Sequence, residues 1–191
     1  MHRPSYAPRA LRAYLRQGGV IAYATRAVFG LGCDPASLRG LRRLRAIKRR
    51  PAHKGVIVIA DRPERLSPFH APLTEAQNTR CVSRWPGSHT WLVPAAARLP
   101  ALLLGTRRQP GQARRIALRV DAHPDAVGLC RRLGMALVST SANRAGRRPI
   151  QTSRECMRQF GSRVRVIPGR VVKHCRPSTI ADLLTERVVR T

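Results

Sequence analysis

The order of apolar and polar positions along the chain follows two rhythms, one typical of amphipathic helices and the other of buried strands. In Ser37–Lys48, leucines and an isoleucine recur every three residues and arginines fill the opposite face, which predicts a helix. Gly55–Ala60 is an unbroken apolar run, as expected for a strand that is buried on both faces. Gly30-Leu31-Gly32 predicts a turn, where the backbone would approach a ligand closely.

The same patterns divide almost the whole chain into alternating helices and strands. Further helices are predicted at 8–17, 71–80, 124–133 and 152–160. Further strands are predicted at Val20–Tyr23, His89–Val93, Arg115–Val120, Ala136–Ser139, Val164–Ile167 and Thr179–Leu183. No repeat, low-complexity tract or change in composition marks a linker, so we expect one α/β domain over residues 1–191.

Length and composition are those of one folded domain. The chain has 191 residues, of which 43% are hydrophobic, which is enough for a core and excludes wholesale disorder. No apolar run approaches the roughly 20 residues that span a membrane, and residues 1–8 lack the apolar region of a signal peptide. The five cysteines are far apart and form no C-x-x-C pair, and the six histidines show no ligand spacing. We therefore expect a cytoplasmic protein with no membrane partner and no protein-held metal.

The charge of the chain is strongly positive. Lysine and arginine total 37 against nine acidic residues, which gives a formal net charge of +28. Such a field attracts polyanions, including RNA and nucleotide phosphates. An arginine-biased codon usage, which places arginine on any exposed face, explains the scattered arginines equally well. The cluster at 39–54 favours a function, because eight basic residues fall on one predicted helix and the loop after it.

Two short motifs suggest a cleft that handles phosphate. Lys48-Arg49-Arg50 can neutralise a polyphosphate, and Ser139-Thr140-Ser141-Ala142-Asn143 offers hydroxyls, an amide and backbone N–H groups at a strand-to-loop turn. The P-loop pattern G-x-x-x-x-G-K-[ST] does not occur. Two structural readings stay open: a solvated helix end for the basic motif, and a turn with side-chain-to-backbone hydrogen bonds for the other.

Six blocks of sequence then point to one family. They are GGVIAYATRAVFGLGCDP (18–35), KRRPAHKGVIVIA (48–60), SRWPGSHTWLVPA (83–95), IALRV (116–120), STSANRAGRRP (139–149) and PSTIADLLTERVVR (177–190). In this order and spacing they resemble the YrdC/TsaC family, the threonylcarbamoyl-AMP synthases, and most closely its single-domain TsaC type. The resemblance implies a YrdC-like fold, in which a twisted mixed β-sheet with flanking helices carries a basic concave cleft.

The resemblance also implies a reaction. Family members make L-threonylcarbamoyl-AMP and pyrophosphate from L-threonine, bicarbonate or CO₂, and ATP, which serves the N6-threonylcarbamoyl modification of adenosine 37 (t6A37) in tRNA. The reaction needs positioning and charge neutralisation rather than a covalent nucleophile. Mg²⁺ would arrive with ATP and need few protein ligands. Further partners implied are tRNA and the proteins that transfer the threonylcarbamoyl group to it.

Site residues carry over where the motifs match. The residues assigned to ATP are Lys48, Arg50, Lys54, Ser141, Asn143 and Arg190. The residues assigned to threonine are Thr25, Arg119, Ser139, Thr140 and Ser178. Surface roles compete for Lys54 and Arg119, and a strand-entry turn competes for Ser178. One departure bears on this site, because Ala24-Thr25-Arg26 stands where the family has Pro-Thr-Glu and so reverses a charge.

Two function classes follow from these observations. The preferred hypothesis is a synthase, because a protein that only binds RNA has no need of the complete set of nucleotide and threonine residues. The alternative is a YrdC-fold protein that binds tRNA or structured RNA with weak or no synthase activity. Its RNA binding would be strongly salt-dependent, since it would rest on counterion release.

Overall fold

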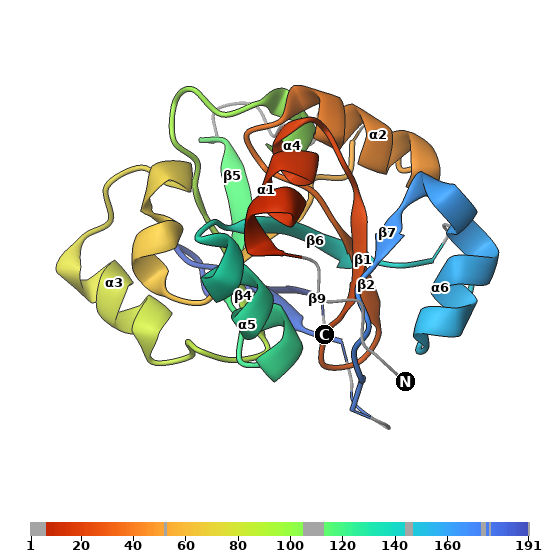
Figure 1. Cartoon of the computed structure of the whole chain (residues 1–191). Coiled ribbons are helices and arrows are strands. Elements are labelled where there is room, and N and C mark those ends of the chain that lie inside the picture. Colours follow the sequence, from red (N-terminus) through yellow and green to blue (C-terminus); the bar gives the residue numbers. More distant parts are fainter. Residues whose placement is uncertain are drawn as a thin grey trace.

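Strands from the whole length of the chain form one sheet in the computed structural model, which describes residues 7–51, 53–104, 113–143, 147–172, 175 and 177–190. Among these residues the sheet has nine strands in the order β7-β1-β2-β6-β3-β5-β4-β8-β9 (Figure 1). The strands are β1 (Ile21–Ala24), β2 (Phe29–Gly32), β3 (Ile57–Ala60), β4 (His89–Pro94), β5 (Arg115–Val120), β6 (Leu137–Ser141), β7 (Arg165–Val166), β8 (Thr179–Asp182) and β9 (Val188–Arg190). The pairs β1–β7, β3–β5 and β4–β8 are parallel and the other pairs antiparallel, so the expected mixed α/β sheet is confirmed.

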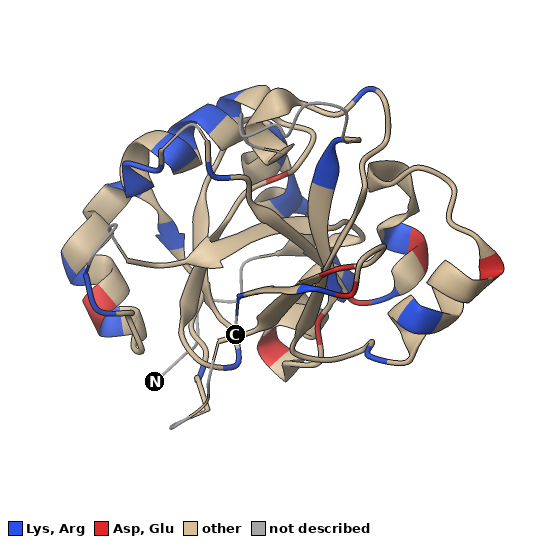
Figure 2. Cartoon of the chain, turned by 180° about the vertical axis from the view of Figure 1, so that it is seen from behind, with Lys and Arg blue, Asp and Glu red and all other residues tan. Residues whose placement is uncertain are grey.

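Helices flank this sheet. They are α1 (Pro8–Arg16), α2 (Leu38–Lys48), α3 (Glu75–Val82), α4 (Ala101–Leu104), α5 (Pro124–Leu133) and α6 (Ser153–Phe160), with short 3-10 turns at Pro63–Arg65, Ser67–Phe69 and Gly161–Arg163. Basic residues recur along α2 in Figure 2. The extent of a single domain over residues 1–191 stays a prediction.

Helix ends follow local side-chain chemistry. Helix α2 begins after Ser37, whose side chain accepts a hydrogen bond from the Gly40 amide, and it ends at Arg49 in a left-handed conformation. Helix α3 begins at Glu75 rather than at residue 71, so the predicted start was wrong. Thr74 and Gln77 form a capping box there, because each side chain bonds the other's backbone amide.

The predicted turn at Gly30-Leu31-Gly32 was also wrong, because these residues belong to β2 and pair with β1 and β6. The glycines serve strand packing: a Cβ on Gly32 would lie 2.6 Å from the Val138 carbonyl oxygen and 2.8 Å from the Tyr23 ring. Close approach of neighbouring strands therefore explains Gly32 better than a turn does. Two further elements, α4 and β9, were not predicted. Each is short, and β9 is exposed along its whole length.

One face of the central strands is covered at one end and open at the other. Ile59 of β3 and Leu137 of β6 belong to a buried cluster with α1 and α5. Successive side chains on one face are two residues apart, so Ile57 and Ser139 share this face. Ile57 packs against the edge of this cluster, and both Ile57 and Ser139 line a cavity. The fold thus leaves an open basin beside a rigid core.

Candidate active site

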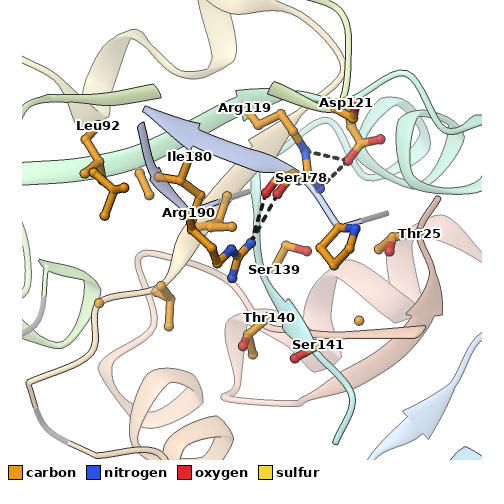
Figure 3. A pocket seen from close by; sticks show the side chains of 18 of the residues that line it. Thr25, Leu92, Arg119, Asp121, Ser139, Thr140, Ser141, Ser178, Ile180 and Arg190 are labelled. Atoms are coloured by element: carbon orange, nitrogen blue, oxygen red, sulfur yellow. Dashed lines mark hydrogen bonds and ion pairs between the residues drawn. The ribbon is translucent and has the colours of Figure 1, made fainter. Parts of the chain in front are cut away.

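The open basin is a cavity of about 1140 Å³. Its walls come from β3, β5, β6, β8 and β9 and from the loops that follow β1, β5 and α2, and Figure 3 shows part of it. Nine of the eleven predicted site residues line it: Thr25, Arg50, Arg119, Ser139, Thr140, Ser141, Asn143, Ser178 and Arg190. The fold therefore brings together residues that lie up to 165 positions apart in the chain.

Lys48 lies behind the cavity wall rather than on it. Its side chain is buried, and its Nζ donates hydrogen bonds to the Ser141 Oγ and the Asn143 carbonyl oxygen, each at 3.1 Å, and to the Ser141 carbonyl oxygen. Burial, together with the smaller effects of the nearby charges of Arg50 and Lys54, lowers the pKa of Lys48 to about 8. Lys48 therefore joins the Lys-x-Arg motif to the Ser-x-Asn loop and holds this loop in place.

Arg50 reaches into the cavity from the loop after α2. Its Nε donates to the Gly55 carbonyl oxygen at 3.1 Å, and its Nη1 donates to the Thr140 hydroxyl at 3.4 Å. Burial lowers the pKa of Arg50, and the charges of Arg45 and Arg190 add to this effect. Lys54, by contrast, is exposed and does not line the cavity, although its carbonyl oxygen accepts a hydrogen bond from the Arg50 Nε at 3.3 Å.

The C-terminal strands supply a second cation. Arg190 of β9 lines the cavity, and its Nη2 donates to the carbonyl and hydroxyl oxygens of Ser178 at 3.3 and 3.4 Å (Figure 3). The Ser178 hydroxyl also accepts a hydrogen bond from Thr90 at 3.4 Å. Although Arg190 keeps an exposed surface, partial desolvation against the cavity wall lowers its pKa, and the charge of Arg119 lowers it too. Arg50, Arg119 and Arg190 thus form a group of like charges that an anionic ligand would stabilise.

Thr25 and Arg26 line the cavity from the turn between β1 and β2. The Thr25 hydroxyl donates to the Val28 carbonyl oxygen at 2.6 Å, which orients this side chain within the turn. Arg26 also lines the cavity, and its Nη1 donates to the Ser88 hydroxyl at 3.3 Å. The residue that departs from the family pattern therefore lies at the cavity and bridges two of its loops.

The charged or polar cavity residues that sequence reasoning missed include Asp121, His123, Arg115 and Asp182. Asp121 accepts two hydrogen bonds from Arg119, and Asp182 forms an ion pair with Arg115 at 3.0 Å. The position of Asp121 and Asp182 at the ends of strands was a usable signal, because loops at strand ends carry functional side chains. Both acids are paired with arginine, so the cavity keeps an excess of positive charge.

Three further observations concern metal-binding groups, membrane-spanning helices and cysteines. Within the described ranges, no group of three histidine, cysteine, aspartate or glutamate side chains lies close enough to hold a metal ion. In the same part of the chain, no helix is long and apolar enough to cross a membrane. All five cysteines are free, and burial raises the pKa of Cys81 to about 11 and of Cys156 to about 12, which disfavours reactive thiolates.

Comparison with known proteins now identifies the family. The sequence model of the Sua5/YciO/YrdC family, which carries the description "Telomere recombination", matches residues 13–191. The chain belongs to the Sua5/YciO/YrdC family. The family predicted from the six sequence blocks is therefore confirmed.

Curated relatives of similar length carry one name. The threonylcarbamoyl-AMP synthase of Methylobacillus flagellatus is 55% identical over 182 residues, which cover 95% of this chain and 98% of the relative. The threonylcarbamoyl-AMP synthase of Thiobacillus denitrificans is 50% identical over 180 residues, which cover 94% of this chain and 93% of the relative.

Solved structures agree with this family. Sua5 of P. abyssi, crystallised with L-threonine, superposes with a TM-score of 0.80 at 25% identity and 94% coverage of this chain. This chain spans about half the length of that protein, 51%. E. coli YciO superposes with a TM-score of 0.79 at 23% identity, covering 96% of this chain and 87% of YciO, which supports the fold.

Proposed function

We propose that this protein is an L-threonylcarbamoyl-AMP synthase, which uses ATP, L-threonine and bicarbonate or CO₂ and releases pyrophosphate. One observation carries the proposal: a single cavity gathers nine of the eleven nucleotide and threonine residues that the sequence resemblance assigns. Curated relatives at 50% and 55% identity, covering nearly the whole chain, are named for this activity.

The charges of the cavity suit the reaction. The threonine amine captures CO₂, loses a proton to solvent and becomes an N-carboxylate, whose oxygen attacks the α-phosphorus of ATP and expels pyrophosphate. Both reactants are anions, so their approach needs neutralisation. Arg50 and Arg190 are cations in the cavity, and fixed charges act strongly where water is excluded. The serine and threonine hydroxyls of β6 offer further donors to phosphate or acyl oxygens.

Arg119 is the group that we assign to the threonine carboxylate. Its guanidinium lies on the cavity wall, and the fork of N–H groups matches a carboxylate in a bidentate arrangement. The Thr25, Ser139, Thr140 and Ser178 hydroxyls complete the proposed threonine pocket. No protein residue acts as a covalent nucleophile in this scheme.

Mg²⁺ is proposed to enter with ATP rather than to occupy a protein site. The two acids of the cavity, Asp121 and Asp182, each pair with an arginine, and this donor set suits a metal carried by phosphates better than one held by carboxylates. The ion would neutralise phosphate charge there. Arg50 and Arg190 would orient the triphosphate around the ion.

A second function is supported by one observation, the basic outer face of α2. Arg39, Arg42 and Arg43 are exposed on this helix, which contains no acidic residue (Figure 2). Such a face would suit the phosphate backbone of RNA, and tRNA is the acceptor of the threonylcarbamoyl group in the proposed pathway. Direct RNA binding and the transfer proteins remain parts of the proposal.

The test is pyrophosphate release from ATP by the purified protein in bicarbonate buffer, with and without L-threonine. We expect release that depends on threonine and a product with the mass of threonylcarbamoyl-AMP. A folded protein that binds ATP but releases no pyrophosphate would contradict the synthase. Salt-sensitive tRNA binding by such a protein would favour the RNA-binding alternative.

A further inference from the structure

Asp121 occupies a position in the fold that has a counterpart elsewhere in the sheet. It comes directly after β5, and Asp61 comes directly after β3, the parallel neighbour of β5. Each aspartate pairs with an arginine at 2.6 Å, Asp121 with Arg119 and Asp61 with Arg65. Only Asp121 lines the cavity, so the two otherwise similar pairs differ in their access to a ligand.

The contacts of Asp121 fix its carboxylate on both sides. Its Oδ2 accepts hydrogen bonds from the Arg119 Nε at 2.9 Å and Nη2 at 2.6 Å (Figure 3). Its Oδ1 accepts a hydrogen bond from the His123 amide at 2.8 Å. The Asp121 amide in turn donates to the Ala60 carbonyl oxygen at 3.0 Å. Asp121 is 5% exposed and Arg119 is 8% exposed, so this pair is held in a largely dry environment.

The geometry of the pair leaves one edge of the guanidinium available. Asp121 uses the side edge of Arg119, formed by Nε and Nη2. The end edge, formed by Nη1 and the second hydrogen of Nη2, presents two parallel N–H groups. Within the described part of the chain, these two N–H groups donate no hydrogen bond to another residue. Two parallel donors are the arrangement that binds a carboxylate in bidentate fashion.

Arg119 also needs an anchor, because the charge of Arg190 acts on it. Its charge contributes to the lowered pKa of Arg190, so the two guanidinium groups repel each other. Without a negative partner, Arg119 would be expected to turn away from this repulsion and lose its orientation. A carboxylate on the side edge offsets the repulsion and at the same time sets the plane of the guanidinium.

We propose that Asp121 is the positioning residue of the amino-acid site: it holds the end edge of Arg119 toward the α-carboxylate of the substrate. Asp121 acts through Arg119. The ligand class is an α-amino acid, and the assignment rests on the proposed function. By fixing the plane of the Arg119 guanidinium, Asp121 would set the orientation in which the amino acid binds.

The test measures binding of L-threonine and of ATP separately, by calorimetry, to the full chain carrying Asp121→Asn. The neutral amide keeps the shape of the side chain but loses the charge, so threonine Kd should rise about tenfold or more, while ATP Kd should stay within about threefold. Asp61→Asn is the matched control, because it breaks a similar pair outside the cavity. It should leave both dissociation constants within about threefold.

A double-mutant cycle separates positioning from general structural damage. Arg119→Met removes the carboxylate-binding group, so adding Asp121→Asn in that background should have no further effect on threonine Kd. An equal effect of Asp121→Asn in both backgrounds would overturn the proposal, and so would unchanged threonine binding in the single variant. A similar loss of ATP affinity would overturn it too.

Two further outcomes are distinguishable. Should Asp121→Asn fail to fold, Asp121→Glu replaces it, because this variant keeps the charge while the added methylene displaces Arg119. Threonine binding should weaken by the same factor. In the Arg119→Met background, Asp121→Glu should have no further effect on threonine binding. If the unaltered chain binds threonine and the Asp121 variants bind it equally well, this assignment alone is overturned. Absence of threonine binding by the unaltered chain would overturn both this assignment and the proposed synthase.

Discussion

The protonation of Lys48 should control nucleotide binding near neutral pH. Burial is the main reason that its pKa falls from 10.5 to about 8, and Lys48 holds the Ser141–Asn143 loop through three hydrogen bonds. We expect ATP to bind the form in which Lys48 is charged. The affinity should therefore fall as pH rises through about 8.

The size of the effect follows from the pKa. With a pKa of about 8, Lys48 is about 90% charged at pH 7 and about 10% charged at pH 9, so ATP Kd should rise about tenfold between them, about 1.4 kcal/mol. A lysine with an ordinary pKa of 10.5 would give almost no change over this range. Phosphate groups, with pKa values of about 6, contribute little above pH 7.

The assay is equilibrium ATP binding from pH 7 to pH 9 at constant ionic strength, without threonine. Lys48→Arg is the control, because arginine stays charged throughout and its profile should be flat. A flat profile for the unaltered protein, or an equal slope for the arginine variant, would refute the reasoning. Folding gives an independent check of the sign: because the folded pKa lies below the unfolded value, the free energy of unfolding should increase from about pH 8 to 10.5.

The other predictions concern the cavity and one helix end. Arg50→Ala should weaken ATP binding and abolish product while circular dichroism stays unchanged; full turnover by the folded variant would defeat the phosphate assignment. Arg119→Lys should raise the threonine KM more than the ATP KM, because lysine cannot reproduce the bidentate fork, and equal changes in steady-state kinetics would contradict that role. Thr152→Ala removes the capping box with Glu155 at the start of α6 and should cost about 1 kcal/mol in urea unfolding, with kinetics unaffected. No change in the unfolding midpoint would show that this cap does not stabilise the protein.

Local sequence patterns were sufficient for most of the fold. The leucine stripe of α2 and the apolar run of β3 were recognised from spacing alone, because a helix or strand must turn its apolar side chains toward a core. Helix α3 was predicted four residues too early, since its start depends on the capping box of Thr74 and Gln77. Strand β2 was mistaken for a turn because its glycines reflect contact with β6, which is remote in sequence.

The candidate site was also predictable only in part from the sequence. Motif matching named nine residues that the fold collects around one cavity, and their roles stay predictions. It also named Lys54, which is exposed outside the cavity, and it did not reveal that Lys48 lies behind the wall. A motif specifies residue types and order, but it carries no information about which side of a loop faces the ligand.

The sequence by itself determined most of the elements, the family and the excess of positive charge, because these depend on neighbouring residues and on composition. Only the tertiary structure decided which charges act together. Arg119 and Asp121 lie two positions apart in the chain, but Arg190, whose pKa the charge of Arg119 lowers, reaches this region through the pairing of β8 and β9 at the far end of the sheet. Electrostatic interactions depend on distance and burial in space, and the folded sheet sets both.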